Sequence, residues 1–249
     1  MFDAACENPH YGRDIVRLLA KRSLREISVT EERLEAAAGH PRHSYELIRA
    51  LLDQVPDFPI SENIVRAAAS TSNGSRAISY LLERRGETLP ITQSILERAA
   101  RCSSLATVKI LLKERGQHLS INEAVLEAAV GNEDHGGEIL DAKLPEWGQQ
   151  IPLTERIILA TVLDKTRSNT DCLEMLLKFY TDFPITPAVV QNAAANEYWS
   201  TDLIELLAKK NREATTEYTK AIANPFIILL IIHLSKNSRY HIRGPTSTD

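Results

Sequence analysis

A phrase that returns at a fixed interval constrains the fold of this chain more than any other feature. The segment "DFPISENIVRAAA" at residues 57–69 returns as "DFPITPAVVQNAAA" at residues 182–195. The apolar residue before Ser or Thr in this phrase is an anchor that recurs at spacings of 31, 31, 30, 32 and 32 residues. A period this regular predicts stacked structural repeats. The six anchors are Val29, Ile60, Ile91, Ile121, Leu153 and Ile185.

Each repeat is predicted to open with a helix. The residue after the anchor is Ser, Thr or Asn, which can accept a hydrogen bond from the unpaired amides of a helix start. An acidic residue, Gln or Pro follows, which suits the first turn. An apolar residue five positions after the anchor has the spacing of a hydrophobic staple. The predicted caps are Thr30, Ser61, Thr92, Asn122, Thr154 and Thr186, and the staple residues are Leu34, Val65, Leu96, Leu126, Ile158 and Val190.

A second helix is predicted in every repeat. Small residues such as Ala68-Ala69 and Ala193-Ala194 end the first helix and allow close approach of a neighbour, and a loop rich in Gly, Ser, Asn and His follows. Apolar residues then recur at three- and four-residue steps, as in "RAISYLLERRG". A helix pair fills about 31 residues, so we expect an all-α, ankyrin-like solenoid of stacked antiparallel helix pairs, with strands nearly absent.

The repeats are expected to form one array over residues 1–235, followed by a disordered tail at 236–249. "FDAACEN" matches the end of a first helix, so residues 1–28 are interpreted as a partial repeat, and 214–235 as a weak capping repeat. The apolar run Phe226–Leu234 is about half the ~20 residues that a membrane-spanning helix needs, and it is expected to cover the last repeat.

Three segments, "ITQSILERAA", "INEAVLEAAVGN" and "ITPAVVQNAAAN", resemble the degenerate ankyrin-like repeats of fungal multidomain proteins. Such repeats often accompany NACHT-type nucleotide-binding modules in self/non-self recognition receptors. The resemblance covers about Phe2–Asn224 and implies a recognition or scaffold role without catalytic residues. It is looser toward standard ankyrin repeats, because "TPAVVQNAAAN" lacks the His of their T-P-L-H-x-A-A phrase.

Composition narrows the classes of function. The formal net charge of −4 argues against binding nucleic acid, including RNA reading by helical repeats. Cys6, Cys102 and Cys172 are far apart and are interpreted as buried or half-buried thiols in a reducing compartment. No basic, apolar leader opens the chain, so a cytoplasmic location without a membrane partner is expected.

Motifs for catalysis are missing from the sequence. No GxSxG, HExxH, GxxxxGK[ST] or GxGxxG segment occurs. His40 and His43 share a loop, but they are interpreted as ordinary histidines at a helix end rather than as metal ligands. We therefore expect no enzyme activity, no metal and no cofactor.

Polar positions that vary between repeats are the candidate partner-binding residues. They lie on one side of the first helix, so stacking would join them into one surface; plain solvation explains them equally well. The aromatic pair in "NEYWS" is a second candidate patch. A protein partner is expected, against two rival readings: a passive spacer between domains, and an enzyme with its active site in the solenoid groove. The candidates are Glu32, Asn63, Arg66, Glu97, Arg98, Arg101, Glu127, Arg156, Gln191, Asn192, Tyr198 and Trp199.

Overall fold

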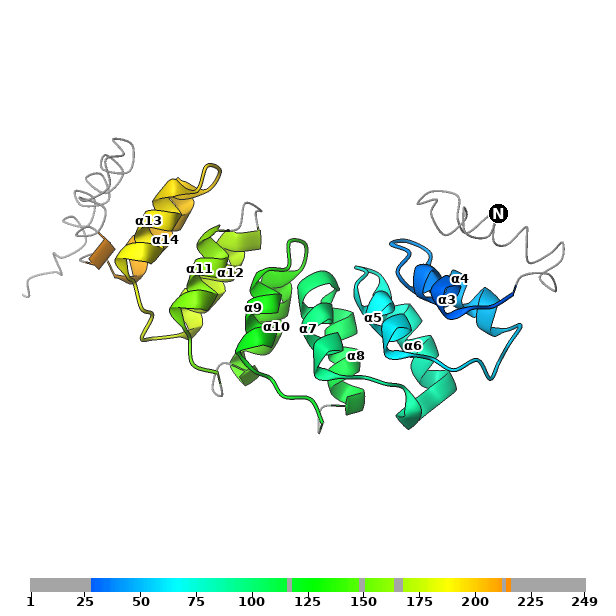
Figure 1. The fold of residues 1–249 in the computed structure, drawn as a ribbon. Helices are drawn as coiled ribbons and strands as arrows, with labels where there is room; N and C mark the ends of the chain where they lie inside the picture. Colours follow the sequence, from blue (N-terminus) through cyan, green and yellow to red (C-terminus); the bar gives the residue numbers. More distant parts are fainter. Residues whose placement is uncertain (1–27, 116–117, 148–150, 164–167, 212–213, 216–249) are drawn as a thin grey trace, which may run out of the picture. The chain divides into compact units, whose positions relative to one another are not determined.

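The computed structural model describes residues 28–115, 118–147, 151–163, 168–211 and 214–215. These residues form twelve α-helices and one short 3-10 helix, and they contain no strand (Figure 1). The all-α prediction is confirmed for this part of the chain. The first helices of the six repeats are α3 (Glu31–Ala38), α5 (Glu62–Ala69), α7 (Gln93–Cys102), α9 (Glu123–Val130), α11 (Glu155–Leu163) and α13 (Pro187–Ala195). The second helices are α4 (Ser44–Leu52), α6 (Gly74–Arg85), α8 (Leu105–Arg115), α10 (Gly136–Trp147), α12 (Ser168–Phe179) and α14 (Ser200–Lys210).

Every first helix begins two residues after its anchor, as the sequence predicts. The side chains of Thr30, Asn122 and Thr186 each accept a hydrogen bond from the amide three residues later, at 3.4, 3.1 and 3.3 Å. Ser61 and Thr92 occupy the N-cap position as predicted, but their side chains make no cap bond. Thr92 instead donates to a carboxylate oxygen of the preceding repeat, at 3.0 Å, so its hydroxyl joins two repeats.

The core consists of the apolar residues that the pattern singles out. All six staple residues have 0% exposure, and the small residues at the ends of the first helices are buried with them. Small side chains allow the helices of neighbouring repeats to approach closely, because no bulky group separates their backbones. Repeat-to-repeat packing therefore follows from local composition.

Contacts divide the chain into two compact units, Met1–Ala142 and Lys143–Asp249, and each is described by itself. In the first unit, α3, α5, α7 and α9 contact one another in sequence and form one row, while α4, α6 and α8 form a second row (Figure 1). In the second unit, α11 contacts α13 and α12 contacts α14. A single array across both units stays a prediction.

A buried polar side chain closes the loop between the two helices of several repeats. It lies eleven residues after the anchor and is His40, Asn132 or Asn196. Each accepts hydrogen bonds from the backbone N–H groups two and three residues later, at 2.9–3.2 Å. These bonds organise the start of the second helix, and the N-cap residues His43 and Trp199 make no side-chain cap bond of their own.

The two asparagines also bond to the preceding repeat. Asn132 Nδ2 donates to the carbonyl of Ala100 at 2.8 Å, and Asn196 Nδ2 donates to the carbonyl of Val162 at 3.0 Å. Both acceptors lie nine residues after their own anchor, so the same bond recurs in both units. The asparagine thus caps one helix and holds the end of another.

Several expectations fall outside the described residues. They concern Cys6, most of the partial repeat at 1–28, nearly all of the capping repeat at 214–235, the apolar run Phe226–Leu234 and the tail at 236–249. Of the cysteines within the described part, Cys102 is half-buried and Cys172 is buried, both as free thiols, as predicted.

Candidate functional site

The candidate residues predicted on the first helices, which we call the polar stripe, lie on those helices. Glu32, Asn63, Arg98 and Arg101 are exposed in the first unit, as are Arg156 and Gln191 in the second. Arg66, Glu97, Glu127 and Asn192 are half-buried. The structure therefore brings seven of the candidates onto one row of the first unit, while three first-helix candidates belong to the second unit: Arg156, Gln191 and Asn192.

The basic side chains of the stripe contact the repeats beside them. Arg66 donates to Ser94 Oγ at 3.4 Å in the next repeat, and Arg98 donates to Ser70 Oγ at 2.8 Å in the preceding one. The Arg101 guanidinium lies against Gly131, where an added Cβ would be 2.7 Å from Nη1. Each of these three arginines thus contacts a neighbouring repeat.

Glu32, an acidic residue of the stripe, also interacts with groups of its own helix. The backbone N–H of Glu32 and the Thr30 hydroxyl lower the pKa of the Glu32 carboxyl. Thr30 is the N-cap of α3, so this carboxylate belongs to the capping arrangement of its own helix.

The loop before α14 presents one of its two aromatic residues. Tyr198 is 67% exposed, whereas Trp199 is half-buried. Both backbone amides donate to Asn196, which fixes the loop and leaves the Tyr198 ring at the surface. The aromatic patch predicted at this loop is therefore reduced to one exposed ring.

A second polar face, which the sequence interpretation missed, lies on the second helices α4 and α6. Its residues pair across the two helices at an interval of one repeat. Arg76 follows Tyr45 by one repeat, and its guanidinium carbon lies 4.5 Å from the Tyr45 ring centroid. Arg84 follows Asp53 by the same interval, and Arg84 Nη2 lies 3.1 Å from Asp53 Oδ1. The repeat period was the available signal, since it places equivalent positions of neighbouring helices side by side.

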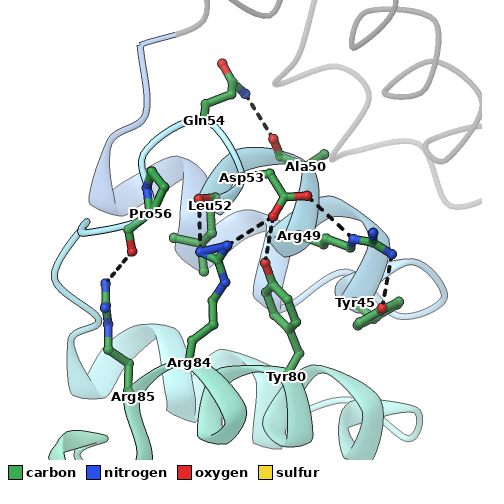
Figure 2. Close-up of polar contacts among 10 residues, drawn as sticks. All are labelled: Tyr45, Arg49, Ala50, Leu52, Asp53, Gln54, Pro56, Tyr80, Arg84 and Arg85. Atoms are coloured by element: carbon green, nitrogen blue, oxygen red, sulfur yellow. Dashed lines mark hydrogen bonds and ion pairs between the residues drawn. The ribbon is translucent and has the colours of Figure 1, made fainter.

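Aromatic rings and Asp53 connect these pairs into one cluster, part of which is drawn in Figure 2. The Tyr45 and Tyr80 rings meet edge to face with centroids 5.7 Å apart. Tyr80 OH donates to Asp53 Oδ1 at 3.2 Å, and Arg49 Nε lies 3.5 Å from Asp53 Oδ2 (Figure 2). Burial, and secondly the Asp53 carboxylate, raise the pKa of Tyr80. The cluster therefore holds the tyrosines in fixed orientations.

Basic residues at the end of α6 anchor that helix to the preceding one. Arg84 Nη1 donates to the carbonyl of Leu52 at 3.1 Å, and Arg85 Nη2 donates to the carbonyl of Pro56 at 3.0 Å (Figure 2). Lys210 does the same in the second unit, where its Nζ donates to the carbonyl of Tyr180 at 2.6 Å. These cations satisfy carbonyls at a helix end or in the loop after it, so their role is structural.

An open groove runs beside this cluster along the exposed face of α6, and we call it the α6 groove. It has a volume of about 340 Å³. Tyr45 of α4 borders one side, and Ala106 and Ile110 of α8 border the other. The groove combines apolar rings and aliphatic carbons with a cation, a carboxylate and the hydroxyls of two serines and two tyrosines, which suits recognition of a peptide. Its lining residues are Tyr45, Ser75, Arg76, Ser79, Tyr80, Glu83, Ala106 and Ile110.

Comparison with known proteins yields one family. The model of a domain of unknown function (DUF7104) matches residues 110–139 and 178–203. Both matched segments end at the same distance from an anchor, since Ile139 follows Ile121 as Leu203 follows Ile185. The same family pattern therefore fits two repeats in the same register, across α9 and α13. No curated protein and no solved structure matches the chain.

The described residues lack the features of two other kinds of site. They contain no group of three or more His, Cys, Asp or Glu residues that could hold a metal ion. Within the same residues, no helix has the length and apolar character needed to cross a membrane.

Proposed function

We propose that this chain is a non-catalytic protein-interaction module of the cytoplasm, built as an ankyrin-like solenoid. The stacking of α3, α5, α7 and α9 supports this architecture, as does the equal register of the two family matches. Rigid repeats of this kind display side chains over an extended surface. Following the resemblance to fungal repeats, we place the chain in the recognition part of a larger receptor-like protein.

The α6 groove is the observation that carries the proposal. Tyr and Arg are enriched among the residues that dominate binding energy at protein interfaces. Here Tyr45, Tyr80 and Arg76 are held together beside an open groove, and their orientations are fixed by contacts between α4 and α6. Side chains that are ordered before binding lose less conformational entropy when a partner docks.

A passive spacer between domains is the second candidate. The observation that favours it is the use of Arg66, Arg98 and Arg101 within the stack, because a spacer needs only rigidity. An active site in the groove receives less support: among the described residues that line it, Glu83 is the single carboxylate, and neither His nor Cys occurs.

Affinity capture with quantitative mass spectrometry tests the proposal on the full chain. Three baits are compared: the wild type, Arg76→Glu in the groove, and Arg66→Glu combined with Arg98→Glu on the first helices. The Arg76 side chain is 68% exposed, so its replacement leaves the core intact. We expect Arg76→Glu to lose specific partners that the wild type and the double variant retain. Identical sets of captured proteins for all three baits would favour the spacer.

A further inference from the structure

We propose that the α6 groove binds an acidic peptide segment, with a carboxylate at Arg76 and a neighbouring apolar side chain against Tyr80 and Ile110. This inference rests on the proposed interaction function and names the chemistry of the partner. Three observations support it: the charge of the second helices, the unused hydrogen-bond donors of Arg76 and the shape of the groove.

The second helices of the first unit are locally basic, although the whole chain is acidic. Helices α4, α6 and α8, together with the α4 C-cap Asp53, carry seven Arg and Lys residues against four acidic residues, whereas α3, α5 and α7 carry four basic against five acidic residues. The formal charge of the full chain is −4. A surface with the opposite sign to the rest of the molecule favours a partner of complementary, negative charge.

Arg76 has donors to spare for such a partner. Its one ion-pair contact within the described residues is Glu46, at 3.5 Å from Nη1. The guanidinium has five N–H donors in a plane, and stacking on the Tyr45 ring fixes that plane while leaving its edge accessible. A planar guanidinium with a free edge matches a carboxylate, which accepts two parallel hydrogen bonds. Lys109, exposed on α8, has no ion-pair partner in the described part of the chain and adds to the positive field.

The groove accepts a linear segment rather than a folded surface. Its volume of about 340 Å³ is at the lower end of the ~300–1,000 Å³ typical of ligand pockets, and it lies open along α6. Ser75 and Glu83 lie at its two ends, about 12 Å apart at the helical rise of ~1.5 Å per residue. An extended peptide covers that distance with about four residues at ~3.3 Å each.

The polar groups along α6 give the bound segment a direction. Arg76 stands at the start of the groove, Ser79 at its middle and Glu83 at its far end. We expect the peptide carboxylate at Arg76, its backbone near the hydroxyls, and an amide or basic group at Glu83. Glu83 at the far end disfavours a phosphate backbone, which carries a negative charge at every residue.

A selection experiment identifies the preferred chemistry even while the natural partner is unidentified. The full chain is immobilised and exposed to a phage-displayed library of random peptides of about eight residues, twice the span of the groove. Binders that also bind Arg76→Glu are removed. We expect the remaining sequences to be enriched in Asp or Glu next to an apolar residue. Recovery of sequences without acidic enrichment would overturn the inference, as would failure to recover any sequence.

Affinity measurements on one selected peptide give the second test. Fluorescence anisotropy with the labelled peptide is expected to show a loss of about tenfold to hundredfold for Arg76→Glu, since hydrogen bonds to charged groups are among the stronger ones. The matched control is Lys209→Glu, an equal charge change at a residue of α14 whose side chain is 65% exposed, and it should change affinity less than twofold or so. Replacing the peptide's acidic residues with Asn or Gln should reproduce the loss.

The outcomes separate this inference from the proposed function. If Arg76→Glu loses captured proteins but the library yields no acidic peptide, the interaction function stands and the acidic partner is wrong. If neither experiment depends on Arg76, the groove has no binding role. Displacement of the peptide by a single-stranded oligonucleotide, with tighter binding of the oligonucleotide, would also contradict an acidic peptide as the natural ligand.

Discussion

Replacement of Asn132 by alanine is the sharpest test of how the repeats are joined. The side chain is 2% exposed and makes four hydrogen bonds. Its Nδ2 donates to the carbonyls of Ala100 and Ser103, at 2.8 and 2.9 Å. Its Oδ1 accepts from the amides of Asp134 and His135, at 3.2 and 2.9 Å. Alanine removes all four bonds at once.

The expected loss of stability follows from which partners water can reach. Asp134 is exposed and His135 is half-buried, so their amides gain water when the asparagine side chain is gone. Ala100 and Ser103 have 0% exposure, so their carbonyls stay unpaired. An unsatisfied buried acceptor costs about 1–3 kcal/mol, so the two carbonyls together give a loss of about 2–6 kcal/mol for the substitution.

Equilibrium urea denaturation, followed by helical circular dichroism, measures this loss. Asn73→Ala is the matched control, because Asn73 is exposed and its amide lies 3.5 Å from its one acceptor, the carbonyl of Pro41. We expect the control to change the free energy of unfolding by less than about 0.5 kcal/mol. Asn132→Asp keeps the acceptor and removes the donor, so it should be at least as destabilising as alanine. Equal stability of Asn132→Ala and Asn73→Ala would refute the role of the bonds between repeats.

Three further outcomes follow from the same geometry. His40→Asn should keep the free energy of unfolding within about 0.5 kcal/mol, because asparagine serves at this position in other repeats, whereas His40→Ala should lose about 1–2 kcal/mol in the same urea assay. Gly74→Ala should lower the thermal midpoint, because its Cβ would lie 2.2 Å from a carbonyl oxygen of α5; Gly39→Ala, with nothing nearer than 3.5 Å, should leave it nearly unchanged. The pKa of Tyr80 is raised, so its contribution to stability is complete below the ordinary value near ~10 and is lost as pH rises through the raised value. Asp53→Asn should lower that pKa without restoring the ordinary value, because burial is the larger cause; tyrosinate absorbance, measured as the difference from Tyr80→Phe, checks this.

Local signals predicted the helices well. Each first helix begins where the anchor, cap and staple place it, and all six staple residues are fully buried. These signals depend on residues within one turn of each other, so a single sequence contains all of the relevant information. Helix starts and buried positions are therefore predictable from the sequence, whereas a single local bond such as that of the Ser61 cap is not.

Side chains that contact a neighbouring repeat could not be assigned in the same way. Thr92 has the sequence of a cap, but its hydroxyl donates to Glu62 of the preceding repeat. Arg98 has the sequence of a solvated surface residue, but its Nε donates to Ser70. Both partners lie about one period away, and a pattern defined inside one repeat does not reveal them. The predictions of the cap and of the polar stripe took no account of hydrogen-bond partners in the neighbouring repeat.

The α6 groove shows how the two kinds of information combine. Polar variation between repeats has two sources: recognition of a partner, and compensation by the residue one period away. Arg84 varies because it pairs with Asp53, and this accounts for its charge without any ligand. Arg76 is stacked on Tyr45 but contacts a carboxylate at 3.5 Å through one edge, so compensation within the stack uses part of its capacity. Comparing each polar residue with the residue one period away shows which charges are compensated within the stack and which could bind a partner. On α4 and α6, Arg76 is the cation that has unused donors and lies beside an open groove.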